Sequence, residues 1–283
     1  MAHTTYSAGV DTNALRETWD AEFGLNPTEE TKIADWVEQP VGAQKFGNTL
    51  YLRKLPAYTA KTYTSDADNG LRAGLTWETA ALERVSAASV IKYVAIGVDK
   101  ALLNRAVDDG NLRSGLKKQG SAAVREGVDI SLFALAASLS QTESGAAIDD
   151  AMVRSALGQL AGSAGGKFND SSAKLLVVTP LELENVWNIP AIKEYQIRGT
   201  VGAAVNAKLN AYGLVWRESG NVYESAGVSY NPLILKDAFA LAWNEKPHVM
   251  DTQFDGITEN FIFVTDFGVC EWFDSSGVSL NTT

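Results

Sequence analysis

The spacing of hydrophobic and polar residues changes several times along the chain, and each change predicts a different element. Strand-forming residues in rough alternation predict two strands, at residues 49–55 and 89–96. The polar stretch between them, residues 62–74, contains the tight-turn dipeptide Asn69–Gly70. The pattern therefore predicts a long hairpin. A lone two-stranded hairpin is marginal in water, so we expect it to lie against another surface, with a neighbouring subunit as the natural candidate.

A three-to-four spacing of apolar and small residues predicts helix within residues 99–139. Glycines weaken the first half of this stretch, so we expect the continuous helix to start near Ser114. A second helix is predicted at residues 148–162, with Asp149–Asp150 in its first turn and Gly162 past its end. The spaced positions of the first helix are Leu116, Ala123, Val124, Gly127, Ile130, Ala134 and Ala137, and its weakening glycines are Gly110, Gly115 and Gly120.

The second half of the chain alternates between strand and helix signals. A buried strand is predicted at residues 174–179, followed by a helix that Thr179 caps and Pro180 begins, and Pro190 begins another. Further strand-like segments lie at residues 212–217, 248–254, 259–265 and 269–273, and an apolar run fills residues 233–243. The polar tail, residues 275–283, is expected to fray.

The first 44 residues are polar, with isolated hydrophobic anchors, and predict an arm with a short helix that begins near Thr28. Two of the anchors, Trp19 and Trp36, need a surface to pack on. The start of the chain shows no basic stretch followed by an apolar run, so no targeting signal is expected. The most apolar stretches, residues 90–98 and 130–139, are shorter than the ~20 residues that cross a bilayer.

Composition and charge limit the classes of function. The chain has 283 residues, of which 46% are hydrophobic and 20% charged, which is typical of a globular protein. Its 24 Lys and Arg residues against 34 Asp and Glu residues give a net charge of −10, which argues against a protein that coats nucleic acid. The lone Cys270 cannot form a disulfide within the chain, so we expect a reducing compartment.

The sequence offers little catalytic chemistry, and we predict that the chain is not an enzyme and has no catalytic, cofactor-binding or metal-binding residues. Its two histidines, His3 and His248, have no metal-ligand partners at the required spacing. Residues 162–168 depart from a phosphate-binding loop, and residues 66–70 depart from a calcium loop. The acidic pairs Asp108–Asp109 and Asp149–Asp150 are most simply helix ends. The seven tryptophans are scattered, which favours anchoring in cores and interfaces: Trp19, Trp36, Trp77, Trp187, Trp216, Trp243 and Trp272.

The order of these parts resembles that of the major capsid protein of tailed bacteriophages. Residues 174–187 (KLLVVTPLELENVW) look like that family's strand leading into a helix of the axial domain. Residues 212–216 (YGLVW) followed by residues 231–242 (NPLILKDAFALA) look like its loop returning to an apolar element, and residues 248–273 look like its peripheral-domain strands. The resemblance covers nearly the whole chain.

The resemblance implies an α+β fold divided in five. Residues 1–44 would form the N-terminal arm, and residues 45–98 the extended β-hairpin loop with its flanking strands. Residues 99–146 would form the spine helix and a part of the peripheral domain. Residues 147–245 would form the axial domain with another part of the peripheral domain, and residues 246–283 the peripheral-domain strands and the C-terminal tail.

The function implied is a structural subunit that self-assembles as hexamers and pentamers into an icosahedral shell around packaged double-stranded DNA. The shell would be assembled in the host cytoplasm and found in the virion, with separate scaffolding and portal proteins as partners and no membrane. A wall that does not grip DNA is consistent with the net charge of −10. Arms and hairpins would supply the heterologous contacts that a closed shell needs.

Two alternatives remain open from the sequence. One is an encapsulin-like compartment with the same fold and enclosed cargo enzymes. The other is a soluble enzyme whose mixed lobe hides a carboxylate pair, such as Asp149 with Asp150. Some members of the resembling family crosslink their subunits through Lys–Asn isopeptide bonds. Lys54 and Lys61 lie on the predicted hairpin, but no local motif marks either as reactive, and ordinary surface lysines are favoured.

Overall fold

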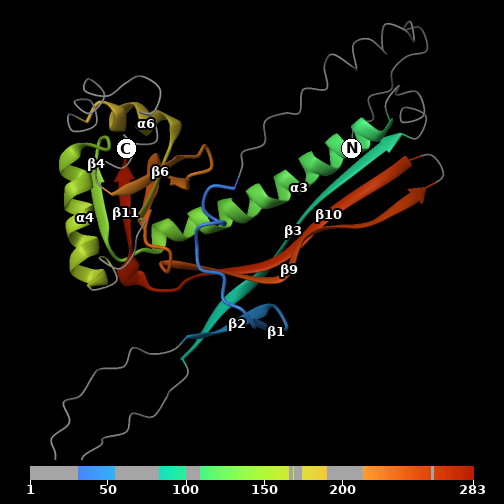
Figure 1. The fold of residues 1–283 in the computed structure, drawn as a ribbon, viewed down its shortest axis with the longest axis horizontal. Coiled ribbons are helices and arrows are strands. Elements are labelled where there is room, and N and C mark those ends of the chain that lie inside the picture. The colour runs from blue at the N-terminus through green and yellow to red at the C-terminus, as the bar shows by residue number, and fades with distance from the viewer. Residues whose placement is uncertain are drawn as a thin grey trace, which may run out of the picture.

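Two β-sheets joined by a long helix make up the fold in a computed structural model (Figure 1). The structure describes residues 31–54, 83–99, 109–165, 168, 174–189, 213–255 and 258–283. The first sheet has the strand order β1-β2-β3-β10-β9, and the second has the order β4-β11-β8-β5-β6, with β7 paired to β8. The predicted helices near Thr28 and Pro190, the turn at Asn69–Gly70, and His3, Lys61, Trp19 and Trp77 lie outside the described residues.

The five-stranded sheet consists of antiparallel pairs. The predicted strands at its centre are parts of longer ones. The strand predicted at residues 89–96 extends to seventeen residues, and the pieces predicted at 259–265 and 269–273 form one strand of fourteen. Its members are β1 (Gln44–Phe46), β2 (Thr49–Lys54), β3 (Glu83–Asp99), β9 (Phe239–Asp255) and β10 (Thr258–Glu271).

The long helix α3 (Asp109–Phe133) packs across one face of this sheet and continues as the 3₁₀ turn η1 (Ala134–Ser138). It begins five residues before the predicted start at Ser114. Gly120 is tolerated within it because the Phe263 ring of β10 occupies the place of a side chain: a Cβ there would lie 2.3 Å from the ring. The predicted helix spacing was wrong at Ile130, which is 45% exposed, whereas Val128 and Leu132 are buried.

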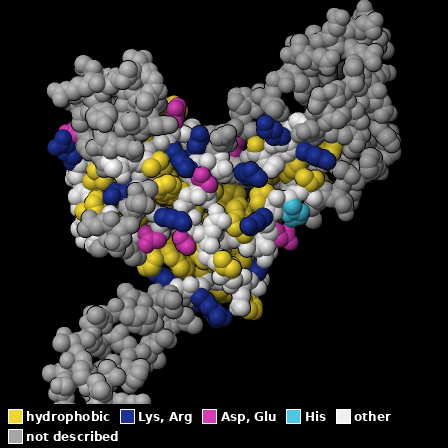
Figure 2. Space-filling model, in the orientation of Figure 1, with side chains coloured by type: hydrophobic (Ala, Val, Ile, Leu, Met, Phe, Trp, Pro, Cys, Tyr) yellow, Lys and Arg dark blue, Asp and Glu magenta, His cyan; other side chains and the backbone are white. Residues whose placement is uncertain are grey.

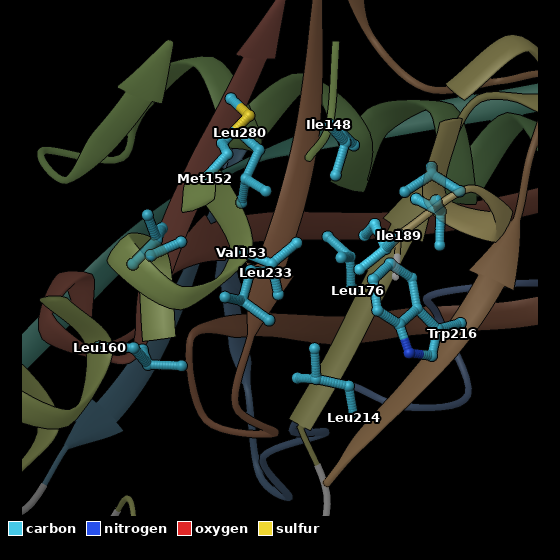
Figure 3. Close-up of a cluster of buried hydrophobic side chains, with 14 of the residues drawn as sticks. Ile148, Met152, Val153, Leu160, Leu176, Ile189, Leu214, Trp216, Leu233 and Leu280 are labelled. Carbon is cyan, nitrogen blue, oxygen red and sulfur yellow. The ribbon is translucent and has the colours of Figure 1, made fainter. Parts of the chain in front are cut away.

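The six-stranded sheet is mixed, since β4–β11 and β5–β6 are parallel and the other pairs antiparallel. Helix α4 (Asp150–Ala164) covers one face of it. Figure 3 shows Val153 and Leu160 of α4 among side chains from the strands, including Leu176 and Leu233. The strands are β4 (Thr142–Gly145), β5 (Lys174–Val178), β6 (Leu214–Glu218), β7 (Glu224–Ser225), β8 (Val228–Ile234) and β11 (Gly277–Thr282).

The predicted helix signals around this sheet are largely confirmed. The Asp149 side chain caps α4 by accepting a hydrogen bond from the Met152 N–H at 2.7 Å. Gly162 is inside the helix, contrary to prediction, and the chain leaves α4 at Gly165, whose φ of +55° suits glycine. Helix α6 (Pro180–Trp187) begins as predicted, with Thr179 as its cap. The apolar run at residues 233–243 is divided between two strands, because a turn at residues 235–238 separates β8 from β9.

The C-terminal tail does not fray. Residues 277–282 form β11, which lies between β4 and β8 and is almost entirely buried, and η2 (Asp274–Ser276) precedes it. Val278 and Leu280 enter the hydrophobic core of this sheet. The buried Asn231 amide of β8 donates to the Leu280 carbonyl at 3.1 Å and to the Thr282 hydroxyl at 3.3 Å. These bonds allow a polar strand to occupy the interior.

Candidate assembly surfaces

The residues considered for chemistry lie apart from one another. His248 is exposed on β9, and its Nδ1 lies 2.9 Å from the Lys246 carbonyl oxygen. Within the described ranges, no group of three His, Cys, Asp or Glu residues is arranged to hold a metal ion. Cys270 is a buried, free thiol, and burial raises its pKa to about 11. Such a thiol is unreactive at neutral pH.

The acidic pairs occupy helix ends, as predicted where they are described. Asp149 is the cap of α4, and the Asp150 carboxylate forms an ion pair with Arg154 one turn along, with 3.0 Å between Oδ1 and Nε. Asp109 is the first residue of α3, and Asp108 lies outside the described residues. Asp149 and Asp150 therefore stabilise the start of a helix.

The described tryptophans act mainly as anchors. Trp216 is buried in the core of the six-stranded sheet, and Trp36 and Trp243 pack against the cluster between the sheets. Trp272 packs against the cluster under β2. Trp187, at the end of α6, is 40% exposed.

An exposed apolar surface lies on β3 and β10, on the face of the five-stranded sheet opposite α3. Side chains of a strand alternate between its faces, and on β3 Ile91 is 60% and Tyr93 69% exposed. Tyr93 is paired with Val264 of β10, and Ala95 with Ile262, so both strands present apolar side chains there. A strand that is apolar on both faces is typical of one covered on both sides. Helix α3 packs on the other face of β3 and β10, against Val94, Phe261 and Phe263.

The edge of the same sheet has a different character. Strand β9 ends the strand order, and near Ala240 the only described partner on its outer side is residue Glu38. Farther along, β9 presents Glu245, Lys246 and Pro247. Charges and proline on an edge discourage indiscriminate strand pairing. The exposed face is thus better suited than this edge to a specific contact.

The base of the predicted hairpin is present, since β2 pairs with β3 from Thr49↔Ala88 to Lys54↔Glu83. Lys54, at the point where the chain leaves β2, is held from within the subunit. Its ammonium donates to the Trp272 carbonyl at 2.7 Å and lies 3.9 Å from the centre of the Phe273 ring. These contacts fix the root of the hairpin to the end of β10.

A buried carboxylate holds the sheet and the hairpin base together. Asp266 of β10 accepts hydrogen bonds from Lys45 of β1, from the Ser89 hydroxyl at 2.5 Å and from the Asn244 amide at 2.7 Å. Burial acts to raise the pKa of Asp266, but these hydrogen bonds and the Lys45 charge outweigh it, so the pKa lies below its ordinary value. Sequence spacing gave no sign of this site, because Lys45 and Asp266 are 221 positions apart.

Residues 31–39 cross from α3 to β9 as an anchored segment. Arg217 of β6 donates to the Lys32 carbonyl at 2.5 Å and pairs with Asp35 at 2.6 Å. At the far end, the Glu38 N–H donates to the Lys236 carbonyl at 3.0 Å. Residues 31–39 of the predicted arm are therefore attached to the body at both ends.

The face seen in Figure 2 carries hydrophobic side chains interspersed with Lys and Arg over α3 and the strands beside it. None of the described helices combines the length and the apolar character needed to cross a membrane.

Comparisons with known proteins give a structural match without a sequence match. No family model matches the chain, and no curated protein matches it. The asymmetric unit of the bacteriophage PhiM1 mature capsid is similar over 100% of this chain and 92% of its own, with a TM-score of 0.61 and 11% identity. The capsid structure of cyanophage P-SCSP1u is similar over 93% and 91%, with a TM-score of 0.61 and 11% identity.

The capsid of Ralstonia phage GP4 is also similar, over 90% of this chain and 88% of its own, with a TM-score of 0.58 and 11% identity. At such identity the likeness concerns the fold. The fold predicted from the order of the segments is confirmed in its outline: the chain has the mixed-sheet fold of phage capsid structures.

Proposed function

We propose that this chain is the structural subunit of a phage capsid, many copies of which assemble into a shell around packaged double-stranded DNA. The observation that carries the proposal is the match to phage capsid structures over nearly the full length of both chains. The exposed apolar face of β3 and β10 supports it independently, because such a face is suited to burial against another subunit.

In this proposal α3 is the spine helix, the five-stranded sheet belongs to the peripheral domain, and α4 with the six-stranded sheet belongs to the axial domain. Strand β11 pairs with β8 and β4. We therefore propose that residues 277–282 belong to the axial group, whereas the sequence assigned residues 246–283 to the peripheral strands and tail. The boundaries predicted from the sequence at residues 44, 98, 146 and 245 remain predictions. So do the scaffolding and portal partners, the hexamers and pentamers, and assembly in the host cytoplasm.

Electron microscopy of the expressed full-length chain tests the proposal. We expect capsomers or closed shells, either from the chain alone or on co-expression with a candidate scaffolding protein. A chain that stays monomeric with that partner at high concentration would contradict the proposal.

A pair of variants connects assembly to the exposed sheet face. Tyr93→Asp places a charge in the middle of that face, and we expect a folded chain that no longer assembles. Gly158→Asp adds the same charge on α4, where a new Cβ meets nothing within 4 Å, and serves as the matched control. We expect it to assemble normally. Equal assembly of both variants would mean that the sheet face is not an assembly surface.

Lysine crosslinking is a separate question. Because Lys54 is already bound to the Trp272 carbonyl and the Phe273 ring, we propose that it serves the hairpin root and not a crosslink. Shells boiled in denaturant should then show no ladder that depends on Lys54. A ladder lost in the Lys54→Arg variant, with Lys61→Arg as the comparison, would overturn this.

A further inference from the structure

Two arginines stand directly opposite each other at the root of the hairpin. Arg53 of β2 and Arg84 of β3 are partners in the antiparallel register, and both side chains are exposed. Partners in such a register point to the same face of a sheet, where like charges repel each other. Neither guanidinium forms an ion pair with another described residue. The repulsion is therefore not offset by any carboxylate in the part of the chain that the structure describes.

Aromatic side chains lie beside this pair of arginines. The Arg84 guanidinium lies 5.1 Å from the centre of the Tyr51 ring, and the Phe46 ring of β1 meets Tyr51 edge-on with 5.9 Å between the ring centres. Phe46 is 63% exposed. We call this surface, formed by Phe46, Tyr51, Arg53 and Arg84, the root face. Aromatic residues and arginine are enriched at protein interfaces, so the root face has the composition of an interface.

The chemistry of the root face suits a carboxylate with apolar neighbours. A guanidinium group presents its N–H donors in a planar fork that matches the two oxygens of a carboxylate. Two such groups on adjacent strands can bind one carboxylate from both sides, which also removes the repulsion between them. Apolar side chains beside that carboxylate would cover the exposed aromatic rings. The acidic excess of the chain, a net charge of −10, makes a second copy a natural source of such a group.

Helix α6 carries a surface of this kind. Leu181, Glu184 and Trp187 follow one another at steps of three residues, which places them side by side along the helix. Leu181 is 78% exposed, Trp187 is 40% exposed, and Glu184 between them is exposed as well. The backbone carbonyl of Glu184 accepts from the Asn188 amide at 3.1 Å, whereas its carboxylate has no partner among the described residues. We call Leu181, Glu184 and Trp187 the α6 stripe.

The root face and the α6 stripe lie apart within one subunit. Strands β1 and β2 belong to the five-stranded sheet, whereas α6 packs on β5 of the six-stranded sheet. Figure 1 shows α6 and the β1–β2 pair on opposite sides of the molecule. A contact between the two surfaces therefore requires two copies of the chain. Such a contact joins different surfaces of identical subunits, which makes it heterologous, the kind that builds rings and closed shells.

We propose that the root face of one subunit docks on the α6 stripe of a second copy. In this contact Arg53 and Arg84 hold the Glu184 carboxylate, and the apolar side chains of the α6 stripe cover the aromatic rings of the root face. The contact rests on the proposed function, because it is one of those through which the shell forms. It is separate from the apolar face of β3 and β10, which uses other residues.

Charge reversal tests the contact in assembly of the full-length chain. We expect Arg53→Glu with Arg84→Glu, and separately Glu184→Arg, to raise the concentration needed for assembly by about tenfold or more, since each change sets like charges against each other. The three substitutions together exchange the signs on both sides and should restore assembly. In the control, Glu218→Arg at an exposed carboxylate of β6 takes the place of Glu184→Arg and should restore nothing.

Urea unfolding of the dilute subunit gives a second measurement, which does not require assembly. The double arginine reversal keeps two like charges opposite each other, so its unfolding midpoint should equal that of the unsubstituted chain. Arg53→Glu alone turns a repelling pair into an attracting one and should raise the midpoint. A lowered midpoint in Arg53→Glu would mean that this arginine already has a partner within its own subunit, and would overturn the proposal.

Two results of the assembly experiment would also overturn the contact. One is normal assembly of the double arginine reversal, and the other is a triple variant that assembles no better than the double one. Normal assembly of the double variant together with lost binding of a short DNA duplex would assign the arginines to DNA instead. The unsubstituted chain separates this proposal from the proposed function. Its failure to assemble would contradict both, whereas equal assembly with and without the arginines would remove only this contact.

Discussion

The Oδ1 atom of Asp129 lies 2.9 Å from the backbone nitrogen of Ala34, ninety-five positions away in the sequence. Its other oxygen accepts from the Lys32 N–H at 2.5 Å. The segment turns immediately afterwards, with the Val37 N–H bonded to the Ile33 carbonyl at 3.2 Å. A carboxylate on α3 thus satisfies the open N–H groups of a turn in a distant segment, as a helix cap does within its own chain segment.

Removing this carboxylate should weaken the attachment of residues 31–39. Asp129→Ala leaves two inward-directed N–H groups without partners, and we expect a loss of about 2–4 kcal/mol in the free energy of unfolding. Asp129→Asn keeps one acceptor and should lose less. Urea denaturation measures both, and hydrogen exchange at residues 32–37 should rise most in the alanine variant. A loss below about 0.5 kcal/mol would show that Asp129 does not hold the segment.

The raised pKa of Asp129 should also make the stability of the protein depend on pH. Burial raises the pKa of Asp129 to about 6 against the lowering effect of its backbone hydrogen bonds. Its contribution to stability is therefore complete below the ordinary pKa of 3.8 and is lost as the pH rises through about 6. A shift of this size corresponds to about 3 kcal/mol. Asp129→Asn should flatten the dependence of unfolding free energy on pH between 4 and 6.5, and an unchanged slope would contradict the prediction.

At the Asp266 site we expect two variants to lose different amounts of stability. Asp266→Ala removes the acceptor of three side chains, and we expect a loss of about 2–4 kcal/mol. Lys45→Met removes one partner, whose side chain is 29% exposed, and should cost about 1 kcal/mol or less. Because the pKa of Asp266 is lowered, its contribution is present above its ordinary pKa and lost as the pH falls. A larger loss of unfolding free energy in Lys45→Met than in Asp266→Ala would contradict the central role of Asp266.

Local patterns predicted the elements that local chemistry determines. The cap at Thr179 with Pro180, the cap at Asp149 and the apolar strand at residues 174–178 are all confirmed, since each depends on neighbours a few positions away. The start of α3 was predicted five residues too late because glycine was weighed by its helix propensity alone. Propensity also gives no sign of why Gly120 stands inside this helix, which is the close approach of Phe263 from a distant strand.

The polar sites at the candidate surfaces could not be predicted for the same reason. Asp129, Asp266 and Asp274 find their partners 95 to 221 positions away, and no spacing of residues records such contacts. In the tail, Val278 and Leu280 alternate with polar residues, which is a strand pattern. The many polar residues around them led instead to the prediction that the tail frays. Their burial depends on Asn231, which lies on another strand.

Two glycines in helices should respond to alanine with opposite signs. At Gly120 a Cβ would lie 2.3 Å from the buried Phe263 ring, so Gly120→Ala should lose about 1–3 kcal/mol from overpacking, more than the helix gains. At Gly158 of α4 a Cβ meets nothing within 4 Å, so Gly158→Ala should gain about 0.5–1 kcal/mol. Thermal or urea unfolding of both variants decides the matter, and equal effects would refute the close approach of α3 to β10.

The position of β11 predicts a large effect from a single residue near the end of the chain. Leu280 is fully buried between α4 and the six-stranded sheet, so Leu280→Ala should cost about 2–5 kcal/mol in the free energy of unfolding. Val41→Ala, at a fully exposed valine, is the control and should change stability by less than about 0.5 kcal/mol. The Leu280 and Thr282 amides should also exchange as slowly as those of β8. Rapid exchange there, together with a small loss in Leu280→Ala, would mean that the tail frays after all and that α4 is held to the sheet by β5 and β8 alone.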